Sequence, residues 1–269
     1  MKKSIGISIS KFEENNVNED AVLANDAVIA VSDGAGGGGL YADKWAKFLL
    51  NNLPEIPFGS FKSLDDWVEN IWEDFYKKHE AIAKGQGGLL LNKFYDEGSL
   101  ATLVAIWRTS SNIYQWITYG DSVAFHYNKR TRILEYSIDN LVEFNNPPYL
   151  INYINKLQEK GYHSGVFHTD EDSVVFVASD TLSHYILMMY QVAGKKKFQE
   201  ELDAAIKVHS KNSQLINNAL SLQDKIYFSC KIKKIIKAAK LEEDFKHYIT
   251  ELKEQHLIGH DDYSFAAFV

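Results

Sequence analysis

Apolar and polar side chains alternate along the first ten residues, where isoleucine occupies positions 5, 7 and 9. A period of two predicts a β-strand with one buried face. The same criterion, together with short apolar runs bounded by turn-forming pairs such as Asn25-Asp26, predicts further strands. We expect these strands at 21–24, 27–32, 99–109, 113–121, 122–128, 132–138, 173–180 and 262–269, with a hairpin turn at 128–131.

Helical periodicity appears in two segments between the early and the middle strands. The segment 40–53 is predicted to form a helix that ends at a proline, and 63–84 carries a long apolar stripe. We expect Ser63 to cap the second helix and the glycines at 85–88 to end it. The segment 182–258 is predicted to be mostly helical, with lysine-rich faces.

The order of these elements predicts an α+β fold. Hairpin connections between the middle strands favour a mostly antiparallel arrangement with helices packed outside, rather than a regular βαβ alternation. No linker divides the chain, so we expect one domain over residues 1–269, in which 195–258 is a candidate helical insertion. The stretch 140–170 is expected to be irregular, because two asparagines and two prolines interrupt it at 145–148.

Composition narrows the class of protein. Of the 269 residues 45% are hydrophobic, which allows a substantial core, and the net charge of −7 gives no bulk attraction to nucleic acid or acidic membranes. The single cysteine, Cys230, excludes an intrachain disulfide and a four-thiolate zinc site. No signal peptide or membrane span is recognised, so we expect a cytoplasmic protein that binds neither nucleic acid nor membrane.

The glycine-rich stretch 34–39 supports two interpretations. Gly34, Gly36 and Gly39 match the G-x-G-x-x-G pattern of dinucleotide-binding loops, after a predicted strand and before a predicted helix. That pattern requires a second parallel strand soon after the helix, which the sequence does not predict. A dinucleotide site and a simple glycine-rich turn therefore remain minor alternatives.

Carboxylates follow or precede apolar strands at five places. They are Asp33, Asp121, Asp180, the pair Asp261-Asp262 and the pair Glu19-Asp20. Clustered carboxylates repel one another, and a divalent cation removes that cost. Oxygen ligands suit hard ions such as Mg²⁺, Mn²⁺ or Ca²⁺, and two such ions can activate a water for attack on phosphorus.

Six short motifs occur in the order found in metal-dependent protein phosphatases of the PP2C (PPM) type, which the sequence resembles. They are NED (18–20), VSDGAGG (31–37), GSLATLVAI (98–106), YGDSVAFHY (119–127), VASDTLSH (177–184) and DDYSFAAFV (261–269). The resemblance implies a four-layer α-β-β-α sandwich, in which two antiparallel sheets are flanked by helices. It also implies a mobile flap near 140–170 and hydrolysis of phosphoserine or phosphothreonine in proteins without a phosphoenzyme intermediate. A Ser/Thr kinase would be the functional counterpart.

The resemblance further implies a role for each acidic position. Asp33 would bridge two Mn²⁺ or Mg²⁺ ions, and Asp33 and Asp20 are the residues expected to be catalytic. The expected metal-binding residues are Glu19, Asp33, the Gly34 carbonyl, Asp121, Asp180 and Asp261, of which Asp121 with Asp180 would serve a third ion present in some members. Asp20 and Asp262 would orient ligands and waters.

Several positions depart from the family pattern. The arginine that usually binds the substrate phosphate is replaced by Asn15, and Lys11 or Lys3 are the candidate substitutes. The histidine after Asp-Gly in eukaryotic members is Ala35 here, and Thr181 and His184 replace a glycine and an aspartate. We interpret His184 as an ordinary helix residue. A metal-binding pseudophosphatase with a regulatory role is therefore the second hypothesis, beside an active phosphatase.

Overall fold

The computed structural model describes residues 3–12, 17–209 and 212–269, and this part of the chain folds into two antiparallel sheets. The strands of the first sheet are, in spatial order, β1 (Ser4–Ile9), β10 (Tyr263–Phe268), β9 (Ser173–Ala178), β6 (Val123–Asn128) and β7 (Ile133–Tyr136). Those of the second are β2 (Ala21–Ala24), β3 (Val28–Ser32), β4 (Leu103–Arg108), β5 (Ile113–Tyr119) and β8 (Tyr162–His168). The predicted α+β class with antiparallel sheets is confirmed.

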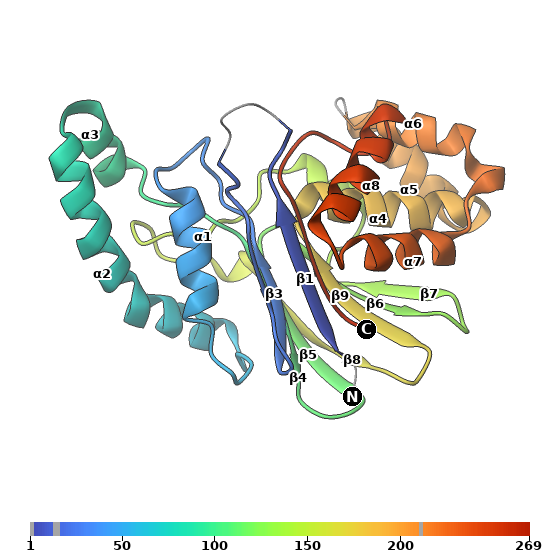
Figure 1. Ribbon diagram of the computed structural model, residues 1–269, viewed down its shortest axis with the longest axis horizontal. Helices are drawn as coiled ribbons and strands as arrows, with labels where there is room; N and C mark the ends of the chain where they lie inside the picture. The colour runs from blue at the N-terminus through green and yellow to red at the C-terminus, as the bar shows by residue number, and fades with distance from the viewer. Residues whose placement is uncertain (1–2, 13–16, 210–211) are drawn as a thin grey trace.

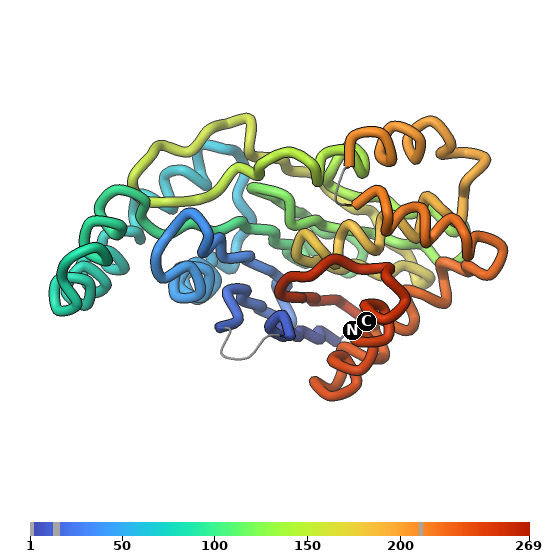
Figure 2. The backbone as a smooth tube through the Cα atoms, turned by 90° about the horizontal axis from the view of Figure 1, so that it is seen from above, coloured from blue at the N-terminus to red at the C-terminus, as the bar shows by residue number. Residues whose placement is uncertain are grey.

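The two sheets pack face to face, and helices cover both outer faces (Figure 1). The second sheet is covered by α1 (Ala42–Asn51), α2 (Phe61–Gln86) and α3 (Gly88–Asp96). The first is covered by α4 (Asp180–Ala193), α5 (Lys195–Val208), α6 (Ser213–Ser221), α7 (Phe228–Ala238) and α8 (Glu242–Glu254). Short 3₁₀ helices occupy Leu141–Asn145, Glu159–Gly161 and Gln223–Lys225. Seen from above, the two groups of helices lie at opposite sides of the molecule (Figure 2).

Burial of both sheet faces explains why the central strands are almost wholly apolar. In β3, Ile29 and Val31 pack between the sheets, whereas Val28 and Ala30 face the α1–α2 layer. Successive side chains of a strand point to opposite faces, so both sets are buried when both faces are covered. In the described part of the chain, no helix combines the length and apolarity needed to cross a membrane.

Two predicted turns are confirmed, and their asparagine side chains explain them. The Oδ1 atom of Asn25 accepts the backbone N–H groups of Ala27 and Val28 at 2.9 and 2.8 Å. The Oδ1 atom of Asn128 accepts those of Arg130 and Thr131 at 3.1 and 2.9 Å. Such side-chain acceptors stabilise tight turns locally, which is why these turns could be read from the sequence.

The limits of α2 differ from those predicted. Ser60, not Ser63, is the cap: the Ser60 Oγ accepts the Ser63 N–H at 3.3 Å, and the Ser63 Oγ accepts the Ser60 N–H at 3.0 Å. The helix therefore begins at Phe61. Its end at Gln86 agrees with the expected glycine stop, but positive φ angles at Gly87 and Gly88 start a further helix, α3, that was not predicted.

Two strand predictions were also wrong in extent. The stretch 140–170 contains a full strand, β8, which pairs with all seven residues of β5. The strand expected over 99–109 begins only at Leu103. Residues before it form isolated bridges from Ala101 to Gly34 and to Ile151, because this segment supports the glycine-rich loop instead of continuing the sheet.

Candidate active site

The acidic residues that the sequence placed at strand ends gather at one end of the two sheets. Burial raises the pKa of Asp33 well above its ordinary value, and nearby negative charges raise it further. Those charges belong to Asp20, Asp180, Asp121 and Asp261. Such mutual effects require short separations, so the fold brings together aspartates from five separate motifs.

Asp33 is fixed through its backbone by Thr102. The Asp33 N–H donates to the Thr102 Oγ1 at 3.1 Å, and the Thr102 N–H donates to the Asp33 carbonyl at 2.8 Å. The Thr102 hydroxyl also lies 2.9 Å from the Ser122 hydroxyl, in the turn that carries Asp121. Thr102 and Ser122 were not singled out from the sequence, although both lie within the recognised motifs, and they link the two aspartates.

The loop glycines make room for Glu19. A Cβ atom at Gly36 would lie 1.8 Å from the Glu19 Oε1, and one at Gly34 would lie 2.5 Å from the Glu19 carbonyl oxygen. None of the glycines at 34–39, all within the described residues, adopts a positive φ. Close approach, rather than an unusual turn conformation, is therefore the reason for glycine at these two positions.

The carboxylate of Asp262 holds two backbone segments together. Its Oδ1 accepts the Lys11 N–H and its Oδ2 accepts the Glu19 N–H, both at 2.7 Å. Both oxygens are thus engaged by the protein, and Asp262 anchors the segment that carries Glu19. The expectation that Asp262 orients ligands and waters stays a prediction.

The pKa values of Asp121 and Asp180 are also raised. Burial, followed by the charge of Asp180, raises the pKa of Asp121 to about 8. Burial and the charge of Asp261 raise the pKa of Asp180 to about 6, against the lowering effect of hydrogen bonds from Thr181 and Asp33. Burial also raises the pKa values of Asp261 and Glu19, while the ammonium group of Lys11 lowers both.

These side chains fit a divalent cation chemically. They offer only oxygen donors, and their burial and mutual repulsion would be relieved by positive charge. The buried Oδ2 atom of Asp20 also lacks a hydrogen-bond partner among the described residues. In the same part of the chain, no three Asp, Glu, His or Cys side chains are already arranged around a single ion position.

Lys11, and not Lys3, lies at this end of the sheets. Its charge acts on Glu19 and Asp261, and its backbone is bound to Asp262. The backbone of Lys3 pairs instead with Val269, at the other end of β1 and β10. Asn15 lies outside the described residues. The structure thus leaves Lys11 as the candidate of the two for an anion contact.

His184 is a helix residue, as expected, and it is deeply buried. It is 4% exposed and contacts the rings of Phe144 and His209 edge-on. Burial, with a smaller effect from His209, lowers its pKa to about 3, so the ring is neutral at physiological pH. Thr181, in the same helix, donates its N–H to the Asp180 carboxylate.

A cavity of about 410 Å³ opens beside Asp121. It lies under the segment in which the resemblance placed a flap, and its lining includes Glu143, Tyr149, Lys160 and His163. The cavity is large enough to take part of a peptide or a small molecule next to the aspartates.

The dinucleotide interpretation of the glycines finds no support in the fold. All strand pairings of the described residues are antiparallel, so β3 is not followed by the parallel strand that a dinucleotide site needs. Glu19 also fills the space beside Gly36 that a pyrophosphate would approach.

Solved structures of bacterial proteins, among them serine/threonine phosphatases, share this fold. Stp1 from Staphylococcus aureus has a TM-score of 0.54 at 14% identity, over 99% of this chain and 94% of its own. The catalytic domain of PstP, solved with two manganese ions, has a TM-score of 0.53 at 15% identity, over 98% and 96%. PppA, a regulatory component of T6SS in Pseudomonas aeruginosa, has a TM-score of 0.51 at 14% identity, over 98% and 96%.

No protein-family model and no curated protein sequence matches the chain significantly. The likeness to the phosphatases therefore lies in the three-dimensional arrangement. Because it covers nearly the whole of each chain, it confirms the fold that the PP2C resemblance implied.

Proposed function

We propose that this protein hydrolyses phosphoserine or phosphothreonine in proteins, using two Mn²⁺ or Mg²⁺ ions. The observation that carries the proposal is the group of buried, mutually repelling aspartates at the end of a sandwich whose structural relatives are serine/threonine phosphatases. Raised carboxyl pKa values in such a group are typical of functional sites. One of the relatives was solved with two manganese ions, which favours the same class of cofactor here.

The chain offers a consistent set of ligands. Asp33 would bind both ions, with Glu19 and the Gly34 carbonyl on one side and Asp180 and Asp261 on the other. Asp121 would serve a third ion together with Asp180. Ions held by these residues would supply an activated water for in-line attack on phosphorus.

The remaining residues position these groups. Asp262 fixes the backbone of Glu19, and Thr102 fixes that of Asp33. The unpartnered Oδ2 atom of Asp20 is suited to accept a hydrogen bond from the attacking water. Lys11 would contact the substrate phosphate as a point charge, in place of the arginine that Asn15 replaces.

Hydrolysis of a chromogenic phosphate ester and of a phosphothreonine peptide tests the proposal. We expect Mn²⁺-dependent activity that EDTA abolishes and that falls at least about 1,000-fold in Asp33→Asn, which removes the bridging charge. Asp170→Asn, at the other end of the sheets, is the matched control and should retain activity.

Two other outcomes would contradict the proposal. Calorimetric Mn²⁺ binding without hydrolysis of either substrate would instead indicate a metal-binding pseudophosphatase that acts as a regulatory module. Absence of metal binding would contradict both functions. The phosphoprotein substrate, a cognate kinase and a cytoplasmic location remain predictions from the sequence.

A further inference from the structure

A second cavity, of about 550 Å³, lies at the end of the sheets remote from the aspartates. Its apolar wall is formed by Tyr127 and Val174, near the ends of β6 and β9, and by Ile232 and Ile236 of α7. Tyr127, Val174 and Ile232 are almost fully buried, so this wall belongs to the core. The volume and the apolar lining are typical of sites for small molecules.

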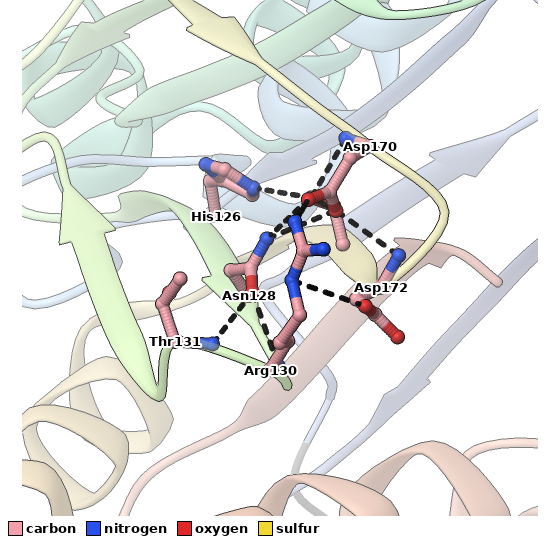
Figure 3. Close-up of polar contacts among 7 residues, drawn as sticks. His126, Asn128, Arg130, Thr131, Asp170 and Asp172 are labelled. Atoms are coloured by element: carbon pink, nitrogen blue, oxygen red, sulfur yellow. Dashed lines mark hydrogen bonds and ion pairs between the residues drawn. The ribbon is translucent and has the colours of Figure 1, made fainter.

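Polar contacts join the two turns that carry Lys129 and Glu171 (Figure 3). The Asn128 Nδ2 donates to both oxygens of Asp170 at 2.9 Å, and the Arg130 Nη2 donates to the Asp170 Oδ2 at 3.0 Å. Lys129 and Glu171 lie between these residues in their respective turns, and both line the cavity. Their backbone positions are therefore fixed.

Two ammonium groups without ion-pair partners among the described residues lie in the cavity lining and suit an anion. Arg130 is paired with Asp170 and Asp172, so its charge is satisfied within the protein. Lys129 and Lys233 line the cavity, and neither has an ion-pair partner among the described residues. Glu171 and the backbone carboxylate of Val269, the last residue of the sequence, also belong to the lining, but neither forms an ion pair with these two lysines.

We propose that this cavity binds a small amphiphilic carboxylate, in the manner of a medium-chain fatty acid. The carboxylate contacts Lys129 and Lys233, and the hydrocarbon chain packs against Tyr127 and Ile232. Burial of the chain supplies the binding energy, and the ammonium groups set the orientation. This binding site is independent of the proposed phosphatase activity.

The two sites are well separated. Asp121 precedes β6 and Asp180 follows β9, whereas the cavity lies at the opposite ends of these strands. Each strand has six residues, which separates the two sites by about 20 Å. A carboxylate in this cavity consequently does not compete with a phosphate ester for the aspartates.

Cys230 provides a direct test, because it is the only cysteine of the chain, is exposed and lines the cavity. The rate of its reaction with a disulfide reagent is measured on the full chain with increasing decanoate, below the micellar concentration. We expect saturable protection, about fivefold at four times Kd, because only the free form reacts. Decanol and decyltrimethylammonium should protect less. Equal protection by all three would overturn the carboxylate assignment, and no saturable protection by decanoate would overturn the site.

Variants locate the bound carboxylate. Lys129→Gln and Lys233→Gln should each weaken decanoate protection about tenfold through loss of one charge contact. Lys234→Gln, on the same helix but outside the cavity lining, is the matched control and should have no effect. Ile236→Trp should fill the cavity and abolish protection, with circular dichroism confirming the fold. Unchanged protection in folded Ile236→Trp would show shielding from outside the cavity and overturn the proposal.

Discussion

Aspartates at the two ends of β6 and β9 have opposite pKa shifts. At one end, burial and like charges raise the pKa values of Asp33, Asp121 and Asp180. At the other, hydrogen bonds from Ser173 and Asn128, with the charge of Arg130, lower the pKa of Asp170. The charged form of aspartate is thus destabilised at one end of these strands and stabilised by hydrogen bonds at the other.

This difference separates a candidate site from its scaffold. Hydrogen-bond donors surround Asp170, so its charge stabilises the turns that it connects. The carboxylates near Asp33 have few donors and repel one another, which lowers the stability of the folded protein without a cation. Repulsion between neighbouring carboxylates favours the binding of a cation. Destabilising arrangements of this kind are expected mainly at functional residues.

Among substitutions that leave every aspartate in place, the largest effect is expected where a small change disturbs the site alone. Gly36→Ala should displace the flexible Glu19 carboxylate, because the new Cβ would lie 1.8 Å from its Oε1 atom. We expect Mn²⁺ affinity and phosphatase activity to fall about 10- to 100-fold, with little loss of stability. Gly37→Ala is the control, because nothing lies within 4 Å of its Cβ position. Equal activity of the two variants, measured with the chromogenic ester, would argue against a role for Glu19.

Substitution of Lys11 tests its proposed contact with the substrate phosphate. Lys11→Gln should raise the KM for a phosphopeptide about tenfold and change kcat less, because a contact with the substrate phosphate contributes mainly to binding. Lys3→Gln, at the opposite end of β1, is the matched control. If both variants have the KM of the unchanged protein, Lys11 does not bind the phosphate.

The stability of the metal-free protein should depend on pH in a defined direction. Asp180 and Asp121 have folded-state pKa values of about 6 and about 8, against an ordinary value of 3.8. The folded state therefore holds protons that the unfolded state has released, and stability falls as pH rises from about 4 to about 8. Each such carboxyl contributes a slope of up to about 1.4 kcal/mol per pH unit.

Urea unfolding in EDTA measures this slope, and Asp121→Asn provides the comparison because it removes one of the two groups. We expect a shallower fall in the variant between pH 6 and 8. Saturating Mn²⁺ should oppose the fall in the unchanged protein. A stability that rises over this range by the same amount in both proteins would contradict the raised pKa of Asp121.

The smallest effect is expected at the end of the strands where Asp170 is hydrogen-bonded and paired with Arg130. Arg130→Gln removes ion pairs whose arginine side chain is 68% exposed, so Tm should fall by no more than about 2 °C. Activity should not change. Metal-free Asp33→Asn should show the opposite sign, a higher Tm, because it removes a buried carboxyl group whose raised pKa lowers the stability of the folded state at neutral pH. Thermal scans of both variants in EDTA check this contrast, and a lower Tm in Asp33→Asn would break it.

Local signals account for what could be predicted of the fold. Alternation at Ile5, Ile7 and Ile9 identified β1, and Asn25 and Asn128 identified turns because their side chains bind the adjacent backbone. The strand β8 was missed because its partner β5 is distant in sequence and local prolines suggested a loop. The cap of α2 was misplaced because Ser60 and Ser63 bind each other, and only geometry distinguishes the cap from its partner.

For the candidate site, the types of functional group could be predicted from the residues alone: carboxylates at strand ends and glycines beside Asp33. The tertiary structure decided how these groups act. It placed Lys11 beside Glu19 and Lys3 at the far end, since β1 runs the length of the sheet. It also showed that Gly36 admits the Glu19 side chain. Both outcomes depend on contacts between segments far apart in the chain, which local patterns do not encode.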